Sequence, residues 1–207
     1  MSDDGTRDVK QERSLERRNA ILQAAADLFT TDRISAVTHR RVATEAGVPL
    51  GAIRYYFSTR EELLIATVNL VEERRHHDAL EALTDASPTA TTRHCATLLL
   101  RAYIGQPHDG TAIYDDYLAA SVGWLADATR ESHALATQLF NHWPAIEADL
   151  SAILKRSELS APVNLITHVI DGAILVGFAW ERGELVERVT DAITEQLTFA
   201  RARDARE

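Results

Sequence analysis

The sequence predicts an all-α protein, with an N-terminal domain of three helices followed by a C-terminal helical bundle, about nine helices in total. Alanine and leucine are abundant, whereas the 207 residues include only 9 glycines and 5 prolines, the two residues that disfavour helix interiors most. Apolar residues recur at helical spacing along most of the chain. With 45% hydrophobic and 26% charged residues, the composition is typical of a folded globular protein.

The first helix follows a charged segment. Residues 1–12 are polar, and we predict a disordered arm there. A helix is predicted over about 14–31, because its apolar residues recur after four, seven and eight positions and so share one face. Those apolar residues are Ile21, Ala25, Leu28 and Phe29.

Two short helices come next. Thr38 is a typical N-cap for a helix over 38–45, and Gly47 ends that helix. The following helix, over 49–56, begins with a proline, which suits a first turn. A turn of three residues, Ala-Gly-Val, joins the pair, and this is the helix-turn-helix arrangement, in which the second helix enters the major groove of DNA. We therefore predict that residues 13–58 form a DNA-binding domain.

The groove-entering helix carries the residue types that DNA contacts require. Arg54 has a fork that matches the O6 and N7 acceptors of guanine, and the hydroxyls of Tyr55 and Tyr56 suit phosphate oxygens. Ile53 and Phe57 are expected to face the core. Small residues permit close approach of the backbone, and the flanking helix N-termini attract phosphate. The predicted DNA-binding residues are Thr38, Arg40, Arg41, Leu50, Gly51, Ala52, Arg54, Tyr55, Tyr56, Thr59 and Arg60.

This region resembles the DNA-binding region of the TetR family of bacterial transcriptional repressors, over about 50 residues. The matching residues are Ala26, Phe29, Thr38, Arg40, Val42, Ala43, Ala46, Gly47, Val48, Gly51, Ile53, Tyr56, Phe57, Arg60 and Leu63. The resemblance implies docking in the major groove and a C-terminal half that binds a ligand and dimerises. Leu50 and Arg54 depart from the residues common in the family, so the resemblance does not imply the operator sequence.

The C-terminal part begins with a capping box, Thr59 followed by Glu62, which opens a long helix over 59–83. We assign residues 59–207 to a ligand-binding and dimerisation bundle. Pro144 is expected to kink its helix or divide it in two. The further predicted helices span about 88–105, 111–128, 132–156, 162–181 and 185–203.

The helix predicted over 162–181 is apolar almost all round, so every side of it needs cover. Either it is the central helix of the bundle, or one face packs inward and the other meets a second subunit. In the second case the amphipathic last helix joins it in a dimer interface. The predicted interface residues are Ile170, Ile174, Phe178, Val189 and Ile193.

Most of the aromatic residues lie in this bundle, where each can belong to the core or line a cavity. The family resemblance implies a small-molecule cavity between the long helix over 59–83 and the helices after it. Asp171 stands in an apolar helix, so its carboxylate requires a partner: a ligand, a histidine such as His94, or the other subunit. The predicted ligand-binding residues are Asp116, Tyr117, Trp124, Trp143 and Asp171.

Charge and motif content exclude several other classes. The net charge of −9 is uneven, because residues 1–60 carry +2 and residues 61–207 carry −11, a basic module on an acidic body. We find no metal-ligand spacing, nucleophile or cofactor motif, and therefore predict no metal, no cofactor and no enzyme. The single cysteine, Cys95, excludes an internal disulfide. Without a membrane span or a signal-peptide core, the protein is expected in the cytoplasm.

Together these patterns predict a homodimeric, ligand-responsive repressor that binds a palindromic DNA operator and is released by a small-molecule effector. The alternative is a helical-bundle small-molecule-binding protein or enzyme in which the N-terminal module is only structural. An activator or a nucleoid-type protein is also left open.

Overall fold

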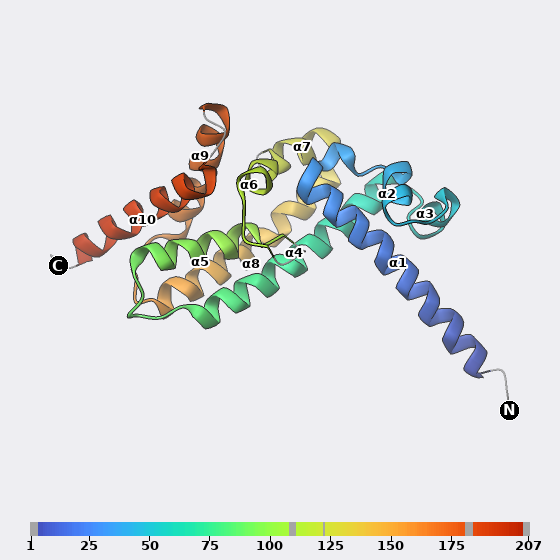
Figure 1. Cartoon of the computed structure of the whole chain (residues 1–207), viewed down its shortest axis with the longest axis horizontal. Coiled ribbons are helices and arrows are strands. Elements are labelled where there is room, and N and C mark those ends of the chain that lie inside the picture. The colour runs from blue at the N-terminus through green and yellow to red at the C-terminus, as the bar shows by residue number, and fades with distance from the viewer. Residues whose placement is uncertain (1–3, 108–110, 122, 181–183, 205–207) are drawn as a thin grey trace. The chain divides into compact units, whose positions relative to one another are not determined.

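The computed structural model describes residues 4–107, 111–121, 123–180 and 184–204, apart from the side chains of residues 4–10, 125, 178–180 and 204. These residues form ten α-helices and one short 3₁₀ helix, with no strand among them (Figure 1). The all-α prediction is confirmed, with one helix more than the approximate nine. The chain divides into two compact units, Met1–Val71 with Leu125–Gln138, and Glu72–Trp124 with Leu139–Glu207.

The first unit contains the three predicted N-terminal helices. They are α1 (Asp4–Asp32), α2 (His39–Glu45) and α3 (Leu50–Tyr56), with the 3₁₀ helix η1 (Ile34–Ala36) between the first two and the start of α4 (Arg60–Asp85) after them. The apolar face of α1 is buried from Ile21 to Phe29, and Ile53 and Phe57 are buried as expected. Burying these side chains fixes which faces of α2 and α3 remain outside.

The first helix begins earlier than predicted. Residues 4–12 are helical, so the prediction of a disordered arm is wrong for them. From residue 6 to residue 20 the chain has no glycine or proline, and it is rich in Arg, Lys, Glu and Gln, which are good helix formers. Once the packed part of α1 exists, each further residue extends a helix that is already nucleated.

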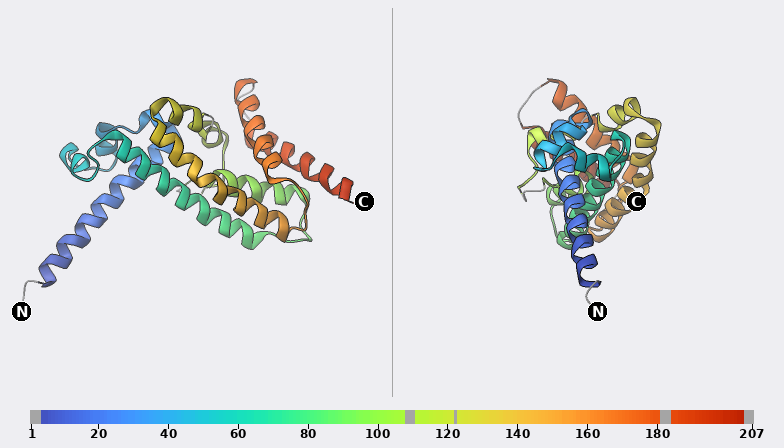
Figure 2. Two further views of the ribbon diagram at one scale, coloured as in Figure 1. Left: turned by 180° about the vertical axis from the view of Figure 1, so that it is seen from behind. Right: turned by 90° about the vertical axis from the view of Figure 1, so that its right-hand side faces the viewer.

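The second unit is built from the remaining helices. These are the later part of α4, then α5 (Thr92–Ile104), α6 (Asp115–Ser121), most of α8 (His133–Arg156), α9 (Val163–Trp180) and α10 (Leu185–Asp204). The helix α7 (Trp124–Glu131) has only its first residue here. In two opposite views α5 lies beside α8 and the later part of α4 (Figures 1 and 2), and α10 packs against α9 and α5.

A buried cation joins three helices of the second unit. Arg75, which is 4% exposed, donates from Nε to Glu72 at 2.7 Å and from Nη2 to Asp149 of α8 at 3.0 Å. Its Nη1 donates to the carbonyl oxygen of Ala102 in α5 at 2.7 Å. A buried charge that is paired on all sides fixes the register of the helices around it.

Three helix boundaries differ from prediction. The predicted helix over 111–128 is divided into α6 and α7 by Gly123, whose φ of +88° few other residues adopt. The helix expected from residue 88 begins at Thr92, because Thr91 accepts from the amide of His94 and so caps it. Pro144 lies inside α8, which stays one helix. None of the described helices has the length and apolar content needed to cross a membrane.

Candidate nucleic-acid interface and effector site

The turn of the helix-turn-helix is built by local signals. The hydroxyl of Thr38 accepts from the amide of Arg41 at 3.3 Å and caps α2, as the sequence predicts. Gly47 then takes a φ of +63°, a left-handed conformation that costs glycine nothing. The amide of Val48 donates to the carbonyl of Ala43, so the turn is also closed by a backbone hydrogen bond.

The outward face of α3 is formed by an arginine, a tyrosine and a glycine. Arg54 is exposed and the side chain of Tyr55 is 80% exposed. Gly51 is exposed too, and a Cβ placed there would meet no atom within 4 Å. Ile53 and Phe57 lie on the opposite, buried face. Among the residues predicted to contact DNA, Leu50 and Ala52 are half-buried beside this face.

Tyr56 is held by α1. Its hydroxyl lies 3.0 Å from Oγ of Ser14, and its ring meets that of Tyr55 edge-on, with centroids 5.0 Å apart. The residue is half-buried, whereas Tyr55 is open. The two adjacent tyrosines therefore differ, and Tyr56 anchors the end of α3. Nothing in the sequence pairs positions 14 and 56.

Arg60 is engaged inside the first unit. Its Nε donates to the carbonyl of Val37 at 2.8 Å, and its Nη2 donates to the carbonyl of Ile34 at 2.9 Å. Its Nη1 pairs with Glu131 of α7. The guanidinium therefore holds the segment that leads into α2, and we propose this role for it in place of the predicted phosphate contact.

The other predicted DNA-binding residues are also placed. Arg41 pairs with Asp32, and Arg40 is exposed in the first turn of α2. Thr59 accepts from the amide of Glu62 at 3.1 Å, and Glu62 accepts in return from the amide of Thr59 at 3.4 Å, so the predicted capping box is present. The exposed candidates whose side chains take part in no such ion pair or capping hydrogen bond are Arg40, Gly51, Arg54 and Tyr55.

The predicted effector residues do not form one group. Asp116 is exposed, whereas Tyr117 is buried in the core of the second unit. The helix predicted over 111–128 contains both Tyr117 and Trp124, but Trp124 begins α7, beyond the break at Gly123. The sequence could not show this break in the helix, because its apolar spacing continues across the glycine.

Two of the predicted effector residues do meet, through a third residue. The hydroxyl of Tyr103 in α5 donates to Oδ1 of Asp171 at 2.9 Å. The ring of Tyr103 lies edge-on to that of Trp143 in α8, with the ring centroids 6.2 Å apart. The indole nitrogen of Trp143 donates to Glu147 at 3.1 Å. Tyr103 is thus the partner that Asp171 requires, and it was missing from the predicted set.

Desolvation by the surrounding side chains shifts the protonation of this pair, although Asp171 is still open to solvent. It raises the pKa of Asp171 above its usual range, and the hydrogen bond from Tyr103 and the nearby His168 oppose part of that rise. Burial and the Asp171 carboxylate raise the pKa of Tyr103 as well, so its hydroxyl stays protonated and can donate. The three side chains offer an acidic oxygen beside two aromatic rings.

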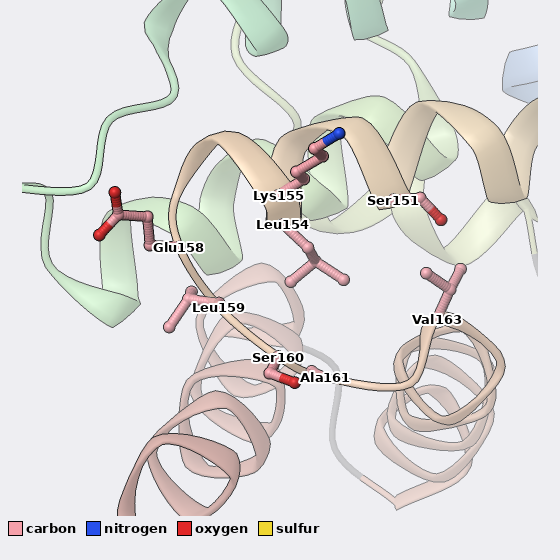
Figure 3. Close-up of a pocket in the computed structure, with 8 residues that line it drawn as sticks. All are labelled: Ser151, Leu154, Lys155, Glu158, Leu159, Ser160, Ala161 and Val163. Atoms are coloured by element: carbon pink, nitrogen blue, oxygen red, sulfur yellow. The ribbon is translucent and has the colours of Figure 1, made fainter. Parts of the chain in front are cut away.

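A shallow hollow of the second unit lies elsewhere, where α8 ends and the chain turns into α9 (Figure 3). Leu154 and Val163 line it together with Lys155 and Glu158. None of the predicted effector residues lines it. Among the described residues, no group of three or more His, Cys, Asp or Glu is placed to hold a metal ion.

The predicted interface residues must be reassigned. Ile170, Ile174, Val189 and Ile193 are all buried in the chain's own core, so they cannot also meet a second subunit. The side chain of Phe178 lies outside the described residues. The open apolar side chains of α9 and α10 are Leu165, Leu175, Val176 and Phe199. The apolar surface of α9 is thus divided between a buried face and an exposed one.

The fold and the outward face of α3 define a helix-turn-helix DNA-binding regulator. Residues 21–67 match the sequence profile of the family described as bacterial regulatory proteins, tetR family. The helix-turn-helix region of the chain is thus of the type found in the TetR family of bacterial transcriptional regulators.

Relatives match along most of the chain. An uncharacterized HTH-type transcriptional regulator in the dhlA 5' region of Xanthobacter autotrophicus is 25% identical over 202 residues, 93% of this chain and 94% of the relative. The multidrug binding protein EbrR, solved with malachite green, has a TM-score of 0.57 at 24% identity. The match covers 88% of this chain and 98% of EbrR. A regulator from Saccharomonospora viridis, solved with choline, has a TM-score of 0.60 at 15% identity, with 87% of this chain and 94% of that one covered.

Proposed function

We propose that the protein is a homodimeric repressor whose two α3 helices bind a palindromic operator and whose C-terminal bundle binds a small-molecule effector. The outward face of α3 is the observation that carries the proposal. Arg54 offers a bidentate donor for a guanine edge, Tyr55 a hydroxyl for phosphate, and Gly51 a backbone with no side chain to hold DNA away. The buried Ile53 and Phe57 keep this face turned outward.

The proposed dimer uses the exposed apolar face of α9 together with the end of α10. Leu175 is 58% exposed, Val176 54% and Phe199 69%. Large apolar side chains exposed on neighbouring helices favour association. A symmetric dimer is the commonest solution for such a surface, and a palindromic operator then follows from its two-fold axis.

The proposed effector is an organic cation that binds at Tyr103, Trp143 and Asp171. Aromatic rings beside a carboxylate are the chemistry that holds such ions, and the body of the protein is acidic. Two structural relatives were solved with malachite green and choline, both of which are organic cations. Transfer of these ligand classes to this chain is part of the proposal.

The proposed switch is a coupling between two binding equilibria. An effector releases the operator only if it binds better to a dimer geometry in which the recognition helices do not match successive major grooves. The helix α4 begins in the first unit and ends in the second, so we propose it as the element that both ligands bias.

Three measurements test this proposal. Operator DNA is selected from a random library with the full chain, and a reporter behind that operator should be repressed when the protein is expressed. Choline and malachite green are then tested for thermal stabilisation of wild type and of Asp171→Asn, which keeps the acceptor for Tyr103 but removes the charge. Stabilisation lost in the variant supports a cation at Asp171. Library enrichment with an activated reporter would refute repression, and no enrichment would favour the rival bundle protein or enzyme.

A further inference from the structure

The N-terminal half of α1, residues 4–20, has no core of its own. From Gln11 to Ala20 every side chain is exposed except the half-buried Ser14, whereas burial begins at Ile21. This half of α1 extends away from α2 and α3 in both figures (Figures 1 and 2). Packing therefore does not explain why the segment is a helix with this sequence.

Its charges are separated onto two faces. At about 100° per residue, the basic positions fall within an arc of roughly 140° and the acidic positions within a different arc of roughly 120°. A solvated helix stabilised by its own ion pairs would instead alternate the two signs along a face. The basic residues are Arg7, Lys10, Arg13, Arg17 and Arg18, and the acidic ones are Asp4, Asp8, Glu12 and Glu16.

The basic side of α1 is the side that touches the recognition helix. Ser14, which falls within the basic arc, bonds to Tyr56. The guanidinium of Arg18 lies over the ring of Phe57, 5.4 Å from its centroid. Among the described side chains, no carboxylate forms an ion pair with Arg13 or Arg17. Arg13 and Arg17 thus continue the basic surface from the end of α3 toward the N-terminus, and the helix backbone reaches position 7 about 10 Å beyond position 14, at about 1.5 Å per residue.

We propose that the basic face of α1, defined by positions 7, 10, 13 and 17, binds the phosphates that flank the base pairs read by α3. Duplex DNA carries one negative charge for about every 1.7 Å of its axis, so an arm of this reach meets several phosphates outside the site read by α3. The acidic face on the other side of the helix would be repelled by DNA, and it therefore orients the arm. The contact carries affinity without base preference, and it rests on the proposed operator binding.

The test compares two lengths of the operator selected with the full chain. The short duplex ends at the last base pair that the selection specifies, and the long one continues for about ten base pairs on each side. Affinity is measured over a series of salt concentrations. Arg13→Gln/Arg17→Gln should lower the salt slope on the long duplex by about two units for each bound chain, and affinity roughly 10- to 100-fold at about 0.1 M salt. On the short duplex it should match wild type.

Matched variants separate charge from structure. Glu12→Gln/Glu16→Gln changes the same number of charges on the opposite face and should keep the wild-type dependence on duplex length. Arg13→Lys/Arg17→Lys keeps the charge and should retain the slope. Equal losses on both duplexes for the Arg-to-Gln variant, or a wild type insensitive to length, would overturn the arm while leaving operator binding intact. A library without enrichment would overturn both.

Discussion

Arg60 and Glu131 form an ion pair between the first residue of α4 and the last residue of α7. The same guanidinium donates to the carbonyls of Ile34 and Val37, which belong to the segment that leads into α2. Arg60 therefore positions the helix-turn-helix from within. The sequence predicts that Arg60 contacts phosphate. In the structure its side chain instead fixes the segment before α2, and with it the position of the helix-turn-helix.

Replacing Arg60 by methionine should reveal this role. The two carbonyls lose their donor, so the free energy of unfolding should fall by about 1–3 kcal/mol, measured by urea denaturation. The control Arg41→Met breaks only an exposed ion pair with Asp32 and should cost about 0–1 kcal/mol. The salt slope of operator binding should stay unchanged in Arg60→Met. A slope lower by about one unit at unchanged stability would restore the phosphate role.

Arg54 should read a base. Arg54→Ala is expected to weaken binding to the selected operator by about 1–3 kcal/mol and to relax preference at one position in each half-site. Arg40→Ala, on the exposed first turn of α2, should weaken binding to all sequence variants alike. Binding of both variants is measured across a panel of single-base operator changes. If the two profiles coincide, α3 does not read bases through Arg54.

Arg75 should be the costliest cation to remove from the second unit. In Arg75→Met the carboxylates of Glu72 and Asp149, both largely buried, lose their main partner, and breaking such a pair costs about 3–5 kcal/mol. The matched variant Arg93→Met removes exposed pairs with Glu187 and Asp191 and should lower the unfolding free energy much less. Comparable losses in denaturant unfolding would show that burial at Arg75 carries no special weight.

Local signals were predictable from the sequence, and contacts between distant residues were not. Thr38 and the Thr59–Glu62 box act within four residues, so their patterns sufficed to place α2 and α4. The bonds of Tyr56 to Ser14 and of Arg60 to Ile34 span 42 and 26 positions. Such pairs depend on how the helices cross, which no spacing rule contains. This is why the sequence predicts a DNA contact for Arg60 and does not predict its bonds to Ile34 and Val37.

The bundle shows the same limit in its apolar residues. The sequence shows that α9 is apolar on both faces, but not which face the chain covers itself. Ile170 and Ile174 are buried, and Leu175 and Val176 are open, although all four have similar hydropathy. The need of Asp171 for a partner followed from its chemistry. The choice of Tyr103 followed only from the packing of α5 beside α9.

Asp171 should make stability depend on pH. Its folded pKa is raised by burial, so between its unfolded and folded pKa values the native state binds more protons than the unfolded chain. This contribution is present at low pH and is lost as the pH rises through that window. Asp171→Asn should therefore be more stable than wild type at pH 7, with a difference that shrinks toward pH 4. Thermal unfolding at several pH values measures it, and a constant difference would mean that Asp171 does not titrate in this way.

The exposed face of α9 should be the dimer interface, and Leu175 its most direct probe. Its side chain is 58% exposed in the single chain, so Leu175→Glu leaves the chain's own core intact. In a dimer the same change would bury an unpaired carboxylate against apolar side chains, which costs several kcal/mol. We expect a folded monomer by light scattering, with helix content unchanged by circular dichroism. The control Leu80→Glu alters an open leucine of α4, 49% exposed, and should leave the dimer intact.

A monomeric chain can occupy only one half-site at a time, so Leu175→Glu should also lose tight binding to the full operator while keeping weak binding to a half-site. A stable Leu175→Glu dimer would place the interface on another surface.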